Sequence, residues 1–247
     1  AHRSENWELV SDEADIYPVD IITKDLKQIS DEVGAERSPS ISPNGKMIAY
    51  SFEERRPLAY TPNQVAIMDI NGNNKRIISK DLDGDADNLQ WSDDNRSIFF
   101  SYDQRGIRKI GQLMLNGEIK NIANDLGGTT LGRPYLSGSY HHSAKNIAFT
   151  YGGGNRPADV AVLMNGKVNV LTELNNDLLD QLKLGDINEL VYNSSFDDQE
   201  IQGWYITPPD FDPQKKYPLI LEIHGGPHLA YGPYFSAELQ IMAASGY

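Results

Sequence analysis

A repeat of about 50 residues constrains the fold of this 247-residue chain more than any other feature of its sequence. Three segments align in register: they begin at Gly45, Asn95 and Ala144, and each leads into an apolar, strand-like run. The first two copies follow clear turn residues, whereas the turn of the third copy, at 140–143, is degraded. Because one such unit cannot bury its apolar face alone, the repeat favours stacked neighbours.

A second feature recurs between these segments. Asn-Gly dipeptides at 71–72, 116–117 and 165–166 each join two strand-like runs. This dipeptide is a strong hairpin signal because both residues tolerate positive φ. Each repeat therefore predicts four short strands, as in a β-propeller blade, and the blades resemble those of TolB and WD40 propellers. A generic all-β sandwich is the alternative, but three features repeated in register favour the propeller.

The repeats also predict how the chain is divided. Three whole blades are expected, preceded by half a blade that consists of an outer hairpin; the blades lie at 38–79, 87–122 and 133–171, and the hairpin strands at 19–22 and 27–30. Half a blade cannot bury its own face, so we expect the natural chain to extend upstream of Ala1. The partial propeller is thus placed at 1–172 and a linker at 173–188.

The pattern changes after the propeller, and residues 189–247 predict the start of an α/β domain. The expected elements are two strands, a Pro-rich connection, a buried strand and a helix capped by Gly246, at 189–192, 201–206, 207–213, 217–223 and 234–244. The compact apolar run 217–223 suits a strand buried on both faces. It leads directly into His224-Gly225-Gly226-Pro227.

The segment from Ile201-Gln202-Gly203-Trp204 through Pro208-Pro209 to this His-Gly-Gly-Pro loop closely resembles the start of the catalytic domain in the prolyl oligopeptidase (S9) family of serine peptidases. The nearest branch looks like the acylaminoacyl-peptidase group, and the blades resemble that family's propeller. The resemblance implies a mostly β fold: a partial β-propeller followed by the N-terminal strands of an α/β-hydrolase domain. It also implies acyl transfer on short peptides by a Ser-Asp-His triad, with no cofactor.

The glycines of this loop are the candidate catalytic residues. In α/β-hydrolases a His-Gly-Gly loop donates one backbone N–H to the oxyanion hole. By the resemblance, Gly225 or Gly226 supplies this donor, and Gly226 is preferred. His224 is expected to be a scaffold residue, because the family's catalytic His lies near the C-terminus.

The 247 residues contain no Gly-x-Ser-x-Gly motif, and in this fold Ser, Asp and His follow in that order. We therefore predict that the chain stops before the nucleophile and is inactive alone. Two alternatives stay open: an esterase-type α/β-hydrolase, which also uses a His-Gly-Gly loop, and a TolB-like binding module without catalysis.

Other polar groups give weaker signals. Residues 81–87 place carboxylates at alternate positions, but the loop lacks the Gly and Glu of a calcium-binding EF-hand, so an acidic loop is expected. His141 and His142 would point to opposite faces of a strand. Gly152–Gly154 is interpreted as a flexible loop, and Glu53–Arg56 as a solvated loop rather than a peptide-binding one. No metal site is predicted.

Composition excludes several classes. The chain has 35 acidic and 22 basic residues, a formal charge of −13, which argues against binding nucleic acid or an anionic membrane. The absence of Cys removes disulfides and thiolate metal sites. No apolar run approaches the roughly 20 residues of a membrane span. We expect a soluble protein whose partner is a short peptide; a cytoplasmic or periplasmic location and homo-oligomer formation both stay open.

Overall fold

The computed structural model describes residues 13–56, 58, 60–226 and 229–247. The chain divides into two compact units. The first runs to Tyr102 and includes residues 110–122 and 142–144; the second contains 103–109, 123–141 and 145–247. The predicted domain limits at 172 and 188 stay predictions.

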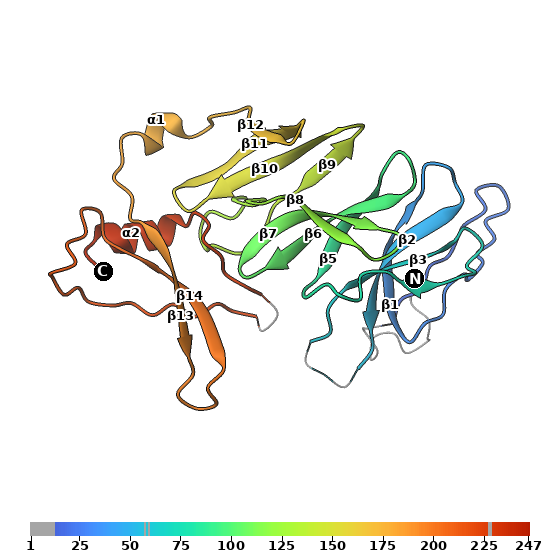
Figure 1. Ribbon diagram of the computed structural model, residues 1–247, viewed down its shortest axis with the longest axis horizontal. Helices are drawn as coiled ribbons and strands as arrows, with labels where there is room; N and C mark the ends of the chain where they lie inside the picture. The colour runs from blue at the N-terminus through green and yellow to red at the C-terminus, as the bar shows by residue number, and fades with distance from the viewer. Residues whose placement is uncertain (1–12, 57, 59, 227–228) are drawn as a thin grey trace. The chain divides into compact units, whose positions relative to one another are not determined.

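Three four-stranded sheets carry the repeat, and each has its strands in chain order (Figure 1). The first sheet consists of β1 (Gly34–Ile41), β2 (Met47–Glu54), β3 (Gln64–Asp69) and β4 (Arg76–Ile77). The second consists of β5 (Ala86–Trp91), β6 (Ser97–Gln104), β7 (Ile107–Met114) and β8 (Ile119–Ala123). The third consists of β9 (Tyr140–Ser143), β10 (Asn146–Gly153), β11 (Arg156–Met164) and β12 (Lys167–Val170). Such four-stranded meanders are propeller blades, which confirms the predicted fold class.

In the described part of the chain, four further elements follow the third sheet. They are α1 (Asn176–Leu179), β13 (Ile187–Asn193), β14 (Glu200–Ile206) and α2 (Ala237–Ala244). Strands β13 and β14 form an antiparallel ribbon (Figure 1), which confirms the two strands predicted between 189 and 206.

The start of each repeat has a common backbone conformation. Gly45, Asn95 and Ala144 have φ values of 70°, 61° and 52°, the left-handed region that Gly and Asn tolerate best. In the first two copies a serine hydroxyl closes the turn: Ser42 Oγ accepts from the N–H of Met47 at 2.9 Å, and Ser92 makes the equivalent bond in the second copy. Repetition of the sequence thus reflects repetition of one turn.

The three Asn-Gly hairpins do not share one geometry. Asn165 and Gly166 both have positive φ, at 51° and 74°, and form the two-residue turn that the dipeptide predicts. In the first two Asn-Gly dipeptides the glycine, Gly72 or Gly117, has positive φ and the asparagine does not. There the glycine N–H closes the turn, as between Gly72 and the Asp69 carbonyl at 2.9 Å. The dipeptide thus located all three hairpins, but neighbouring residues set their form.

The core of the first unit lies on both faces of the first sheet. Alternate residues of β3 point to opposite faces. Val65 and Ile67 join a buried cluster with residues of the second sheet, among them Trp91, Ile98 and Phe100. On the other face, Ala66 and Met68 pack with a second group that includes Ile16, Ile29, Tyr50 and Phe52. The first sheet is therefore buried on both sides, as an interior blade requires.

The predicted outer hairpin strands at 19–22 and 27–30 are wrong in register. The backbone N–H of Ile29 bonds to Ile16, that of Lys27 to Pro18, and that of Asp20 to Asp25. Residues 21–23 form the turn instead of a strand. The Asp20 carboxylate fixes this turn, because it accepts hydrogen bonds from the N–H groups of residues 22 and 23 at 2.8 and 2.9 Å.

Close packing explains glycines in the second unit that the sequence analysis assigned to a flexible loop. Gly152 and Gly153 end strand β10, so that prediction is wrong. A Cβ on Gly152 would lie 2.7 Å from Gly128 Cα, and one on Gly154 would lie 2.7 Å from the Ile187 side chain. Gly152 needs to be glycine because backbone atoms of a neighbouring segment approach it closely, whereas at Gly154 the contact is with the end of a side chain.

Buried polar contacts hold the C-terminal part of the second unit together. The Tyr234 hydroxyl accepts a hydrogen bond from the N–H of Arg108 at 2.9 Å and donates one to the carbonyl of Leu126 at 3.1 Å. The Gln240 side chain, on α2, bonds both the N–H and the carbonyl of Gly185, at 2.8 and 3.1 Å. These bonds anchor α2 and the residues before it.

Helix α2 begins three residues later than predicted. The Ser236 hydroxyl caps it by accepting a hydrogen bond from the N–H of Leu239 at 3.2 Å. Gly246 has a φ of 93° just beyond the helix, which confirms the predicted cap. Among the described residues, no helix is both long and apolar enough to cross a bilayer.

The predicted buried strand at 217–223 is wrong in this structure. The segment pairs with no strand among the described residues, and its apolar side chains are exposed: Leu219 by 84%, Leu221 by 77% and Ile223 by 75%. A strand of a parallel sheet is buried only when strands flank it and helices cover it. No described element supplies such neighbours.

Candidate active site

The two candidate glycines lie in an exposed loop that follows the apolar segment 217–223. Gly226 has a φ of 147°, a conformation that residues with a Cβ rarely adopt. Gly225 lacks this restriction, and the nearest atom to a Cβ built on it is the Tyr135 hydroxyl oxygen, at 3.6 Å. Pro227 of the motif and His228 lie outside the described residues.

His224 contacts the loop and one aromatic ring. Its Nδ1 lies 2.9 Å from the carbonyl oxygen of Gly225. Its ring meets that of Tyr231 edge to face, with centroids 5.7 Å apart. Both contacts are within its own segment, as a scaffold residue would make; the expectation that it is not the general base stays a prediction.

An arginine from a distant part of the sequence lies beside this loop. The Arg133 guanidinium forms an ion pair with Glu222, two residues before His224. Its Nε also pairs with Glu238 Oε2 at 3.0 Å, in the first turn of α2. Partial desolvation opposes the charged form, but the two carboxylates still raise the pKa of Arg133. One cation therefore bridges the segments before and after the glycine loop.

Backbone hydrogen bonds fix the segment that carries this arginine. The N–H of Leu136 bonds to Ala230, that of Gly232 to Pro134, and that of Ala237 to Leu131, at 3.2, 3.0 and 2.9 Å. The Ser236 hydroxyl also donates to the carbonyl of Gly132 at 2.6 Å. Residues 131–136 thus run beside 230–237, which follow the loop in sequence.

Aromatic side chains complete the surroundings. The rings of Tyr135 and Tyr231 meet edge to face, with centroids 4.8 Å apart. The Tyr231 hydroxyl donates to Glu222 Oε1 at 3.3 Å. Burial, followed by the hydrogen bond with Tyr135, raises the pKa of Tyr231 to about 12. The phenol therefore keeps its proton at neutral pH and acts as a donor to the carboxylate.

Gly225 and Gly226 were predicted as site residues from the sequence, whereas Arg133, Tyr135 and Tyr231 were not. Arg133 and Tyr135 lie in the irregular stretch before β9, which carries no strand or turn pattern that points to a site. Glu222 was noted only as part of an apolar run. Their proximity depends on contacts across 89 residues for Arg133 and Glu222, which no local pattern reports.

Other groups that the sequence singled out make internal contacts. Asp85 accepts hydrogen bonds from the Tyr60 hydroxyl and the N–H of Asn63, both at 2.7 Å. The ring of His142 stacks on Phe99 with centroids 4.2 Å apart. Within the described ranges, no group of three or more His, Asp or Glu side chains could hold a metal ion.

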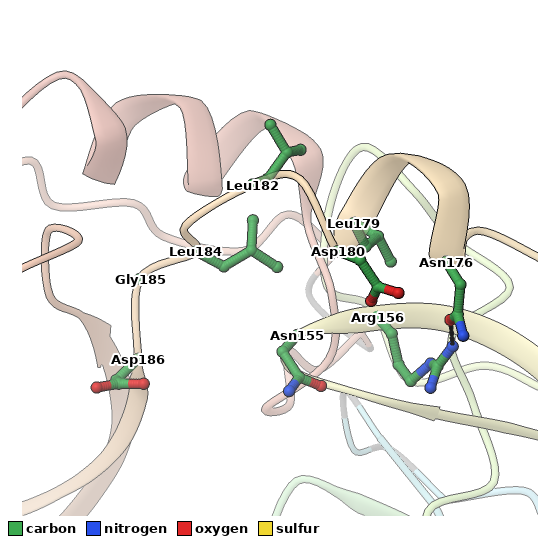
Figure 2. Close-up of a pocket in the computed structure, with 9 residues that line it drawn as sticks. All are labelled: Asn155, Arg156, Asn176, Leu179, Asp180, Leu182, Leu184, Gly185 and Asp186. Carbon is green, nitrogen blue, oxygen red and sulfur yellow. Dashed lines mark hydrogen bonds between the residues drawn. The ribbon is translucent and has the colours of Figure 1, made fainter. Parts of the chain in front are cut away.

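A cavity of about 290 Å³ lies elsewhere in the second unit, between the β10–β11 turn, α1 and the segment before β13 (Figure 2). Figure 2 shows Arg156 directed toward Asn176, whose Oδ1 accepts a hydrogen bond at 2.6 Å. Arg156 also pairs with the buried Asp159 carboxylate at 3.0 Å. Its charge is thus already matched within the protein, and neither candidate glycine lines the cavity.

Several curated proteins that resemble this chain are named dipeptidyl-peptidase 5. No family model matches the sequence. Dipeptidyl-peptidase 5 of Porphyromonas gingivalis is 27% identical over an alignment 247 residues long, which covers 96% of this chain and 34% of that protein. Dipeptidyl-peptidase 5 of Aspergillus fumigatus is 30% identical over an alignment 203 residues long, which covers 78% of this chain and 27% of that protein. The chain therefore spans 34% and 27% of the length of these two curated relatives.

Solved structures agree on the fold. Acylaminoacyl peptidase of Pyrococcus horikoshii matches 94% of this chain and 34% of its own, with a TM-score of 0.72 and 22% identity. An acylaminoacyl peptidase in complex with Z-Gly-Gly-Phe-chloromethyl ketone matches the same shares with a TM-score of 0.75 and 22% identity.

Proposed function

We propose that the chain belongs to the prolyl oligopeptidase (S9) family of peptidases, and that the protein of which it forms part is a serine peptidase that hydrolyses short peptides or acyl-peptides. One observation carries the proposal: similarity to dipeptidyl-peptidase 5 extends over 96% of the chain. The complex of a structural neighbour with Z-Gly-Gly-Phe-chloromethyl ketone supports a peptide as the substrate.

In this proposal Gly226 acts through its backbone. A serine oxygen attacks the scissile carbonyl carbon, and the carbonyl electron pair moves onto oxygen. The Gly226 N–H donates a hydrogen bond to that oxygen and stabilises the developing charge. A histidine accepts the serine proton and passes it to the leaving amine, after which water hydrolyses the acyl-enzyme. The serine, histidine and aspartate would be supplied by the rest of the protein.

A positive φ at Gly226 supports its assignment over Gly225. The value of 147° requires glycine, so the sequence cannot vary there without moving the backbone. Loss of one oxyanion donor typically reduces kcat about 100- to 1000-fold. This makes the backbone conformation of a single residue a strong determinant of the rate.

We further propose that the 247-residue chain has no peptidase activity by itself, since it contains no Gly-x-Ser-x-Gly nucleophile motif. The test compares the isolated chain with the full-length protein on a dipeptidyl p-nitroanilide and an N-acyl amino acid p-nitroanilide. We expect turnover by the full-length protein and none by the chain. Turnover by the purified chain would contradict the second proposal.

The same assay separates the substrate classes. The names of the curated relatives favour release of dipeptides from a free N-terminus, so the dipeptidyl substrate should be preferred. Hydrolysis of p-nitrophenyl esters without hydrolysis of either anilide would instead indicate an esterase. If the full-length protein hydrolyses none of these substrates, a binding module is favoured and the proposed activity is overturned.

A further inference from the structure

We infer that Arg133 is a positioning residue, which holds the His224–Gly226 loop in place through Glu222 and Glu238. The inference rests on the proposed role of Gly226 as an oxyanion donor. It adds a residue that lies outside the glycine motif and far from it in sequence.

Arg133 contacts two carboxylates that lie on either side of the loop in the sequence. Glu222 precedes the loop and Glu238 follows it in α2, and the Arg133 guanidinium contacts both. A second bond joins Arg133 Nη2 to Glu238 Oε1 at 3.3 Å. The planar guanidinium presents donors in a fixed fork, so two partners define its orientation and their own separation. The cation therefore restrains the loop from both sides.

The backbone of the segment that carries Arg133 is itself held by hydrogen bonds. Residues 131–136 bond to residues 230–237 through three backbone hydrogen bonds. The Arg133 carbonyl also accepts from the N–H of Tyr135 at 2.9 Å. A side chain on a fixed backbone can hold its partner groups at a defined position, whereas one on a mobile loop cannot.

Glu222 also contacts an aromatic residue of the same site, Tyr231. Its Oε1 accepts hydrogen bonds from both Arg133 and the Tyr231 hydroxyl. Tyr231 in turn packs against His224 and Tyr135, and the Tyr135 hydroxyl lies over Gly225. The carboxylate is thus the point where the cation and the aromatic contacts of the loop meet.

Magnitudes distinguish positioning from a purely stabilising role. The side chains of Arg133, Glu222 and Glu238 are 35%, 31% and 42% exposed, and ion pairs this exposed add little to stability. A displacement of a catalytic group by about 1 Å, in contrast, can reduce the rate about 100-fold. Loss of Arg133 should therefore affect turnover much more than folding.

The test uses Arg133→Gln and Arg133→Lys in the full-length protein, with Arg105→Gln as the matched control. Arg105 also bridges two carboxylates, Glu189 at 3.4 Å and Glu200 at 3.2 Å, but both belong to the β13–β14 ribbon. We expect Arg133→Gln to lower kcat by roughly 10- to 100-fold with KM changed less than about threefold. Arg133→Lys should recover part of the loss, and Arg105→Gln should keep the wild-type kcat.

Hydrogen exchange gives a second readout that does not need activity. The amides of residues 224–226 should exchange roughly tenfold faster in Arg133→Gln than in wild type or Arg105→Gln, at an unchanged melting temperature. The inference is overturned if Arg133→Gln matches Arg105→Gln in kcat and in exchange, or if only its KM rises. If the wild-type protein hydrolyses no peptide, the proposed function fails, and exchange alone still decides whether Arg133 positions the loop.

Discussion

The two glycines after His224 differ in what their backbones require. Gly226 has a φ of 147°, which disfavours any Cβ, whereas a Cβ on Gly225 meets only the Tyr135 hydroxyl at an ordinary 3.6 Å. An alanine at 226 must therefore shift the loop, and an alanine at 225 need not. This asymmetry allows the choice between the two candidate donors to be tested.

We predict that Gly226→Ala lowers kcat of the full-length peptidase about 100-fold, because a donor displaced by about 1 Å stabilises the oxyanion poorly. Gly225→Ala should cause a clearly smaller loss. Steady-state kinetics on a peptide p-nitroanilide measure both. A larger loss for the substitution at 225 would mean that Gly225, not Gly226, is the donor.

A second residue of interest is Glu36, in β1. Its side chain is only 2% exposed, and neither carboxyl oxygen has a hydrogen-bond partner among the described residues. Burial raises the pKa of Glu36 from 4.5 to about 7; the Ser30 hydroxyl and Lys75 oppose the rise, and the nearby Asp15 adds to it. Between about pH 4.5 and 7 the folded protein therefore keeps a proton that the unfolded chain has lost.

This difference predicts how stability changes with pH. Between about pH 4.5 and 7 the folded state binds more protons than the unfolded chain, so the free energy of unfolding falls as the pH rises. The total fall is about 3 kcal/mol, and the free energy of unfolding does not change further above pH 7. Glu36→Gln should remove this dependence. Urea unfolding at pH 5 and pH 8 tests it, with the exposed Glu118→Gln as control. A Glu36→Gln variant that keeps the wild-type dependence would contradict the assignment.

At the scale of elements, the blade turns show how the repeat is encoded. The same left-handed position is glycine in the first copy, asparagine in the second and alanine in the third. Alanine at φ 52° is strained, since its Cβ crowds the following carbonyl. The degraded third copy thus keeps the turn geometry without the residue that suits it.

We predict that Ala144→Asn raises the free energy of unfolding by about 0.5–1 kcal/mol, because Asn tolerates the left-handed region. The reciprocal change, Asn95→Ala, should lower it by more, since Asn95 Oδ1 also accepts a hydrogen bond from the N–H of Asn44 at 2.9 Å. Urea denaturation of both variants measures the effects. Destabilisation by Ala144→Asn would show that the turn is not strained.

At the scale of the whole molecule, the apolar segment 217–223 is exposed to solvent along most of its length. Three of its side chains are at least 75% exposed, although its sequence suits a strand buried on both faces. The chain spans about a third of the curated relatives. The remaining residues of the full-length protein would supply the neighbouring strands.

We therefore predict that the backbone amides of 217–223 exchange rapidly in the isolated chain and are protected at least about 100-fold in the full-length protein, because buried strands open rarely. Hydrogen exchange followed by mass spectrometry compares the two. Strand β6, six of whose eight residues are already buried, is the internal control and should be similarly protected in both. Equal, rapid exchange of 217–223 in both proteins would refute a strand there.

Local sequence patterns were enough to predict the features that depend on near neighbours. The in-register repeat of apolar runs, the turn residues at 45 and 95, and the three Asn-Gly dipeptides predicted the blades, because strand pattern and φ are set within a few residues. The glycine loop was found for the same reason: its residues are contiguous. The detailed hairpin geometry, the register at 16–29, the strand residues at 152–153 and the start of α2 escaped this local reasoning.

Tertiary structure alone decided the rest. It brought Arg133 to Glu222 and Glu238, across 89 and 105 residues, and it buried Glu36 without a described hydrogen-bond partner. It also left 217–223 exposed, although the pattern of that segment predicted burial. All three features have the same physical cause, because solvation and charge pairing depend on which distant segments pack together. Hydrophobic pattern and turn conformation, in contrast, depend on residues that are adjacent in the sequence.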